Sequence, residues 1–318
     1  MFFRSQNMLL KDYEFVDLYI GVDFIDVSSG DGRKSAPEYL KDEITQVREK
    51  CVNLEKQIGF VEFSLLHDDI LYRVTTINDL SMNSIFILRK SMAEIRELES
   101  INLPLPIMEL INTKDMDGLI LIAGKMRNGK TTTASSLMKY RLEQFGGVGV
   151  AIEDPPETRL HGLHGTGRCL QIAASRLKGG YKEQIIIAMR TGADLMFIGE
   201  IRDTATAVEA VNASINGHMI ISTIHAGSVQ EAIEKLHSLC DKDTKQVVAD
   251  GIKIVIYQEI IVVRQNGVGA VIGKRLELSA FIVDDTTRFL IRDGDLSAIN
   301  QQVSHQSTKL QWDSNGTN

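Results

Sequence analysis

The sequence predicts an α/β protein in two parts, a small α+β domain over residues 1–100 and a larger domain with a mostly parallel sheet over residues 101–318. A length of 318 residues favours two domains. From residue 118 onward, short apolar runs alternate with helical patterns, which is typical of a parallel sheet covered by helices on both faces. Before residue 100, strand-like runs instead lie on both sides of a single helical pattern, as in a small α+β domain.

One helix and four strands are expected in the first part. Residues 38–57 carry their apolar residues on one stripe at helical spacing, which predicts an amphipathic helix. The stripe consists of Leu40, Ile44, Val47, Cys51 and Leu54. Strand-like runs rich in β-branched and aromatic residues occur at 14–20, 60–66, 70–77 and 84–89.

The second part begins after two closely spaced prolines, Pro104 and Pro106, which place the domain boundary between residues 95 and 115. Strands are expected here at 119–123, 148–152, 195–199, 219–223, 259–264 and 270–282. Helices are expected at 130–144, 203–215 and 228–240. Residues 301–318 are polar and aperiodic, and we expect them to be disordered.

The composition excludes several classes of protein. With 43% hydrophobic and 24% charged residues, the chain has the make-up of a globular protein. A net charge of −7 argues against a broad nucleic-acid-binding surface. The three cysteines lie far apart, so we expect buried thiols in a reducing compartment and no zinc site. The sequence has no apolar run long enough to span a membrane and no signal-peptide core, which predicts a cytoplasmic protein.

The most specific motif follows the apolar run 119–123. Gly124, Gly129, Lys130 and Thr131 match the P-loop pattern of glycine, four residues, glycine, lysine and a hydroxyl residue. In such a loop, backbone N–H groups and a helix N-terminus hold phosphate oxygens, the lysine neutralises the β- and γ-phosphates, and the hydroxyl ligates Mg²⁺. The predicted nucleotide-binding residues are Gly124, Lys125, Met126, Arg127, Asn128, Gly129, Lys130, Thr131 and Thr132.

Two further apolar runs end in carboxylates. Glu200 follows a run at the carboxyl end of a predicted parallel strand, where ligands bind. P-loop enzymes use an acid at this place to hold the Mg²⁺ water shell. The run 148–152 is followed by Glu153, Asp154 and Glu157, and the prolines between them stiffen the turn that presents Glu157. Acids clustered there are candidates for polarising the attacking water.

A third apolar run, 219–223, leads to His225. A histidine at this edge of the sheet can hydrogen-bond a γ-phosphate or the attacking water. A lone histidine more often has a structural role. Because His225 shares its sheet edge with the P-loop, we favour a role in the site.

The four motifs follow one another in a fixed order: the P-loop, Ile-Glu-Asp-Pro from Ile152, Gly-Glu-Ile-Arg-Asp from Gly199, and Gly-His…Thr-Ile-His-Ala from Gly217. This order resembles the Walker A, aspartate, Walker B and histidine boxes of the type II/type IV secretion and type IV pilus ATPase superfamily. The resemblance is densest over residues 118–240. Weaker similarity, to the family's PAS-like domain and to a helix of the short retraction-type pilus motors, is found at 16–19, 73–75, 86–89 and 287–294.

The resemblance implies a PAS-like α+β domain followed by a RecA-like P-loop ATPase domain. It implies that the protein binds ATP and Mg²⁺ and couples hydrolysis to mechanical work. Glu157 takes the place of the catalytic carboxylate, Glu200 holds the Mg²⁺ shell together with Thr131, and His225 and His218 are the two histidine-box residues.

The resemblance also implies an assembly. Arg73 and Arg89 stand where the family's N-terminal domain supplies arginines to ATP. The family resemblance implies a homo-oligomer, most simply a hexameric ring. Its partner would be the inner-membrane platform protein of a pilus or secretion machine, at the cytoplasmic face of that membrane. Nucleic acid binding is not expected.

The chain departs from the family pattern at several places. Lys125–Asn128 replaces the usual Pro-Thr-Gly-Ser of the P-loop, and Pro156 replaces an aliphatic residue. The zinc-binding tetracysteine module of the assembly motors is absent from the sequence, and we expect no long extra domain before the PAS-like one. Three functions stay open: an ATP hydrolase for pilus dynamics, secretion or conjugation-type transport; a nucleotide-gated interaction module with little turnover; and a RecA-like DNA motor. Steady-state phosphate release separates the first two, and DNA-stimulated turnover would favour the third.

Overall fold

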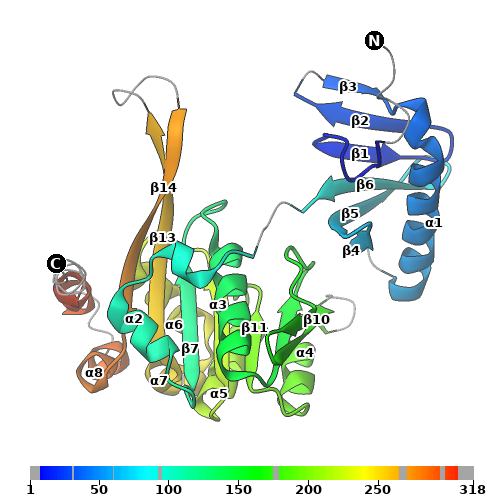
Figure 1. Cartoon of the computed structure of the whole chain (residues 1–318). Helices are drawn as coiled ribbons and strands as arrows, with labels where there is room; N and C mark the ends of the chain where they lie inside the picture. The colour runs from blue at the N-terminus through cyan, green and yellow to red at the C-terminus, as the bar shows by residue number, and fades with distance from the viewer. Residues whose placement is uncertain are drawn as a thin grey trace. The chain divides into compact units, whose positions relative to one another are not determined.

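The computed structural model describes residues 8–30, 32–59, 61–91, 95–174, 179–264, 271–293 and 298–306. These residues form two compact units (Figure 1). The first unit comprises the described residues before Glu94 together with Asp154–Arg159. The second unit comprises the other described residues.

The first unit is a six-stranded antiparallel sheet with the strand order β3-β2-β1-β6-β5-β4. Its helix, α1 (Lys41–Ile58), follows the 3₁₀ turn η1 (Glu38–Leu40). The strands are β1 (Asp17–Ile20), β2 (Ile25–Ser29), β3 (Gly32–Ser35), β4 (Glu62–His67), β5 (Ile70–Asn78) and β6 (Ser84–Lys90).

The predicted amphipathic helix is confirmed. Leu40, Ile44, Val47 and Cys51 are fully buried, and Leu54 packs against the same core from the side. Strands β2 and β3 were not predicted. All four residues of β3 are exposed, so its sequence lacks the alternating pattern of a half-buried strand, and the strand exists through its pairing with β2.

The second unit is built on an eight-stranded sheet with the order β14-β13-β7-β12-β11-β8-β10-β9. The six inner strands run parallel, and the edge strands β14 and β9 are antiparallel to their neighbours. The strands are β7 (Gly118–Ala123), β8 (Val148–Glu153), β9 (Gly162–His164), β10 (Gly167–Ala173), β11 (Leu195–Ile198), β12 (Met219–Ile224), β13 (Ile252–Arg264) and β14 (Val271–Ile282). This arrangement confirms the predicted α/β class with a mostly parallel sheet.

Helices cover both faces of this sheet (Figure 1). One face packs against η2 (Leu98–Ile101), α2 (Leu105–Ile111) and α3 (Lys130–Phe145). The other face packs against α4 (Gly180–Met189), α5 (Thr204–Ile215), α6 (Val229–Leu239), α7 (Lys242–Gly251) and α8 (Asp285–Asp293). Strands β7, β11 and β12 are buried along their whole length, as expected for parallel strands with both faces covered.

The two closely spaced prolines lie at the start of α2, where Pro104 is the N-cap and Pro106 is the second residue. A proline at these positions loses no intrahelical hydrogen bond. One part of the second unit differs from the expectations. Residues 298–306 are helical, so the first six residues of the segment 301–318 are ordered. The Gln306 side chain bonds the backbone N and O of Ile282 and ties this helix to the sheet. Residues 307–318 lie outside the described residues.

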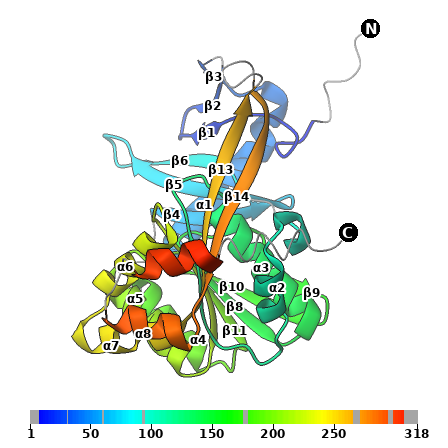
Figure 2. The same ribbon diagram turned by 90° about the vertical axis from the view of Figure 1, so that its left-hand side faces the viewer.

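The β13–β14 hairpin is longer than predicted and continues beyond the last residue pair that joins β13 to β7, Tyr257 and Ala123 (Figure 2). Strand β13 also begins earlier than predicted, at Ile252. In the described part of the chain, helices that are both long and apolar enough to cross a membrane are absent.

Candidate nucleotide-binding site

The P-loop connects the buried strand β7 to helix α3. Gly124 follows the last residue of β7, and Lys130 is the first residue of α3. Gly129 caps α3 at φ +77°, in the left-handed region that glycine adopts without strain. The first N–H groups of a helix have no partner within it, so this end of α3 offers donors for phosphate oxygens.

Lys130 is only 8% exposed. Its Nζ donates a hydrogen bond to the carbonyl of Lys125 at 3.0 Å and lies 3.4 Å from Nδ1 of His225. The ammonium group is therefore held at the mouth of the loop, next to the end of β12.

His225 joins the P-loop to the end of β11. Its Nε2 lies 3.3 Å from Oε1 of Glu200, and its backbone carbonyl accepts a hydrogen bond from Lys235 at 2.8 Å. Strands β7, β12 and β11 are neighbours in the sheet. Three predicted residues, Lys130, His225 and Glu200, thus form one row of contacts along the carboxyl edge of the sheet.

The pKa of His225 is lowered from its ordinary value. Burial is the main cause, the Lys130 ammonium group adds to it, the Glu200 carboxylate opposes it, and Lys235 also lowers it. A neutral imidazole explains both contacts, because Nε2–H donates to Glu200 while Nδ1 accepts from Lys130.

Without nucleotide or metal, this pKa shift should make unfolding pH-dependent. A folded-state pKa below the unfolded value means that the unfolded chain binds more protons, so the stability from neutral His225 is present above the unfolded pKa of about 6.5 and is lost as the pH falls through the folded pKa. Denaturant unfolding in EDTA between about pH 5 and pH 8 should have a shallower pH dependence in His225→Gln. His305→Gln, which changes an exposed histidine, serves as the control. If the free energy of unfolding depends on pH equally in the wild type and in His225→Gln, the lowered pKa of His225 is contradicted.

The residues predicted to hold Mg²⁺ fit that ion. Thr131 is the second residue of α3, and Glu200 follows β11 with a side chain that is 28% exposed. Hydroxyl and carboxylate oxygens are the hard ligands that Mg²⁺ prefers, with water completing its shell.

Glu157, Arg73 and Arg89 belong to the first unit. Arg73 and Arg89 are directly opposite each other on β5 and β6, so their side chains share one face of that sheet. Arg73 Nη1 lies 3.8 Å from Oε1 of Glu157, and Arg89 pairs with Asp17 at 2.8 Å. Within this unit, the two arginine candidates and the carboxylate candidate therefore lie close together.

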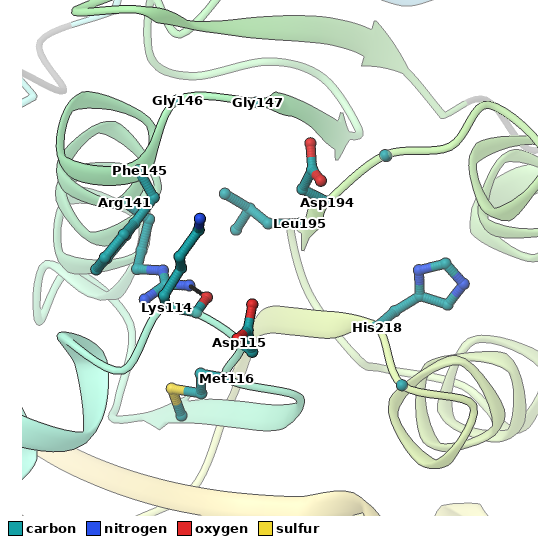
Figure 3. Close-up of a pocket in the computed structure, with 12 residues that line it drawn as sticks. Lys114, Asp115, Met116, Arg141, Phe145, Gly146, Gly147, Asp194, Leu195 and His218 are labelled. Atoms are coloured by element: carbon teal, nitrogen blue, oxygen red, sulfur yellow. Dashed lines mark hydrogen bonds between the residues drawn. The ribbon is translucent and has the colours of Figure 1, made fainter.

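His218 lies away from the P-loop. It precedes β12 and its carbonyl accepts a hydrogen bond from Gly118, the first residue of β7, whereas His225 follows the other end of β12. His218 lines a pocket of about 350 Å³ at the amino-terminal ends of the strands, with Lys114, Asp115, Arg141 and Asp194 (Figure 3). The structure thus separates the two histidine-box residues by the length of a strand.

The interior of the P-loop is divided between solvent and core. Lys125, Met126 and Arg127 are exposed, whereas Asn128 is only 9% exposed. Arg127 has a φ of 65°, which is uncommon for a residue with a side chain.

Glu153, one of the acids predicted to cluster after the run 148–152, ends β8. It is 3% exposed and accepts a hydrogen bond from Gln171 at 2.7 Å. One polar residue at this edge was missed from the sequence: Gln258 on β13, which is fully buried against the P-loop. The available signal was a single glutamine within an apolar strand.

The comparisons with known proteins identify the family. The model of the type II/IV secretion system protein family matches residues 64–302, more than half of the chain. Competence protein ComGA of Bacillus subtilis is 28% identical over 57% of this chain and 50% of that protein. Competence protein ComGA of Streptococcus pneumoniae is 31% identical over 64% of this chain and 62% of that protein. The match therefore spans half to about three fifths of these relatives' lengths.

A crystal structure of the pilus retraction motor PilT with bound ADP has the same fold. It superposes with a TM-score of 0.73 at 22% identity and covers 93% of this chain and 87% of the other. The ordered motifs, the P-loop geometry and the family match together show that the chain belongs to the type II/IV secretion system protein family.

Proposed function

We propose that the chain is an ATP hydrolase that works as a ring-shaped motor, most simply a hexamer, for type IV pilus dynamics, type II/IV secretion or conjugation-type transport. The observation that carries the proposal is the row Lys130–His225–Glu200 at the carboxyl edge of the parallel sheet, directly beside the P-loop. Ligands of such sheets bind at this edge.

Each residue has a separate task in the proposed reaction. Lys130 and the first amides of α3 hold the β- and γ-phosphates, and neutral His225 keeps Lys130 and Glu200 in place. Thr131 and Glu200 would hold Mg²⁺, which would supply positive charge to the phosphates. Glu157 orients and deprotonates the attacking water, and Arg73 and Arg89 offset the negative charge that develops on the γ-phosphate.

The partners follow from the same proposal. One relative is a competence protein and one structural neighbour is a pilus retraction motor. By analogy we propose that the partner of this chain is an inner-membrane platform protein of a pilus or secretion machine, at the cytoplasmic face of that membrane. A nucleotide-gated module with little turnover is the second candidate, because Lys125 and Arg127 add two exposed cations to the loop. Measured steady-state phosphate release decides between them.

The two carboxylates should fail in different ways. Glu157→Gln should bind ATP with Mg²⁺ normally and hydrolyse it about 10²–10⁴-fold more slowly, because only the base is lost. Glu200→Gln should instead raise the Mg²⁺ concentration needed for half-maximal turnover, because a ligand of the metal shell is lost. Phosphate release across a Mg²⁺ titration, together with nucleotide binding, measures both effects. Glu62→Gln, which removes the other carboxylate near Arg73, is the matched control, and superimposable profiles of the two test variants would refute separate roles.

A further inference from the structure

The P-loop packs against the part of β13 that extends beyond its neighbour β7. Strand β13 pairs with β7 only as far as Tyr257, which is opposite Ala123, the last residue of β7. Beyond this point the backbone and side chains of β13 that face β7 need other partners. The P-loop, which continues from β7, supplies them.

Asn128 of the P-loop forms two hydrogen bonds with β13. Its side-chain Oδ1 accepts a hydrogen bond from the backbone N–H of Ile260 at 3.3 Å. Its backbone carbonyl accepts a hydrogen bond from Nε2 of Gln258 at 2.5 Å. The residue directly before Gly129 and Lys130 is therefore attached at two points to a strand that lies about 130 residues further along the chain.

The orientation of the Gln258 amide is fixed by its surroundings. The atom that faces the Asn128 carbonyl has to be the amide nitrogen, because two carbonyl oxygens would repel each other. The side chain is fully buried, and this orientation leaves its Oε1 without a hydrogen-bond partner among the described residues. A buried acceptor without a partner is unfavourable, so the orientation that bonds Asn128 lowers the stability of the folded state.

The loop needs such a restraint. Arg127 has a φ of 65°, in a region where a residue with a Cβ is strained, so the neighbouring contacts have to hold the loop in this shape. The first glycine of the motif lies close against the same strand, because a Cβ on Gly124 would lie 2.6 Å from the carbonyl oxygen of Gln258. Strand β13 thus contacts both ends of the P-loop interior.

We propose that Gln258 is a positioning residue of the nucleotide site, which holds the P-loop through Asn128 in the shape that binds the triphosphate. The inference rests on the proposed function, since it concerns nucleotide binding. The inference goes beyond the proposed function because it makes β13, the first strand of the β13–β14 hairpin, a part of the nucleotide-binding site. A shift of β13 would change the affinity for ATP, and bound ATP would in turn stabilise β13 in its present position.

The decisive variant is Gln258→Leu, measured with a fluorescent non-hydrolysable ATP analogue and by phosphate release. Leucine removes the donor to Asn128 and also the unpaired Oε1, so the Tm should change little. The dissociation constant of the analogue and the KM for ATP should rise about tenfold, the equivalent of one hydrogen bond. The kcat should change less than about twofold. Ser214→Ala removes a buried side-chain hydrogen bond on α5, away from the loop, and should leave the affinity unchanged.

A second variant tests the same contact if Gln258→Leu folds poorly. Asn128→Ala removes the acceptor of the Ile260 amide, so hydrogen exchange at that amide should become faster and the analogue should bind more weakly. Unchanged affinity in both variants, with normal binding by the wild type, would overturn the positioning role. A lower Tm, with a loss of affinity that matches the fraction of unfolded protein, would mean that Gln258 has only a structural role. That result would also overturn the positioning role. Absence of nucleotide binding by the wild type would overturn the proposed function itself, and the inference with it.

Discussion

Replacing Lys130 with alanine should reduce ATP hydrolysis by about 10³-fold or more, because the variant lacks the fixed cation that meets the β- and γ-phosphates. The exposed Lys125 and Arg127 cannot substitute for it, because Lys130 is held in place by the Lys125 carbonyl and by His225. Phosphate release at saturating ATP measures the effect.

The fold should survive this change. Lys130 contributes a buried side chain at the sheet edge, and the two core clusters of the second unit consist of other residues. Lys253→Ala is the matched control, since Lys253 pairs with Asp117 at the amino-terminal end of β7 and should keep full activity. A Lys130→Ala variant with a normal Tm that retained most of its turnover would disprove the P-loop assignment.

Arg73→Ala and Arg89→Ala should each lower kcat by about 10³–10⁵-fold if these arginines stabilise the transferring phosphoryl group. They lie side by side on β5 and β6, and Arg73 also contacts Glu157, so both can serve one site. Phosphate release and analogue binding together separate a loss of catalysis from a loss of affinity.

Controls for these variants come from the same sheet. Arg89→Ala leaves the half-buried Asp17 without its partner, so Asp17→Asn shows how much of the effect is due to the broken ion pair. Arg33→Ala breaks a similar pair with Asp26 on β2 and β3 and should keep its activity. Arg73 and Arg89 variants with full turnover would remove both residues from the mechanism.

Mixing the inactive variants tests the ring. If Arg89 acts on the site of a neighbouring subunit, blends of Arg89→Ala with Lys130→Ala should recover part of the activity, and turnover per subunit of the wild type should rise with protein concentration. Mixed rings that form without recovering activity would place Arg89 in the site of its own subunit. A fully active monomer would end the ring proposal.

Much of the site follows from the sequence alone. The P-loop, Glu200 and His225 could be placed on one edge because each follows an apolar run, and parallel strands end at the same edge of a sheet. The amphipathic helix of the first unit followed from its spacing of apolar residues. Such signals lie within short stretches of sequence, so they can be recognised without knowledge of the fold.

Tertiary structure decided the rest, because it depends on which distant segments meet. The exposed strand β3 exists only through its pairing with β2, and Arg73 faces Arg89 only because of the register of β5 and β6. Gln258 appeared in the sequence as an isolated polar residue in an apolar strand. The structure gives it a role because β13 pairs with β7 and extends beyond the end of β7. Groups on this part of β13 therefore donate hydrogen bonds to Asn128 of the P-loop.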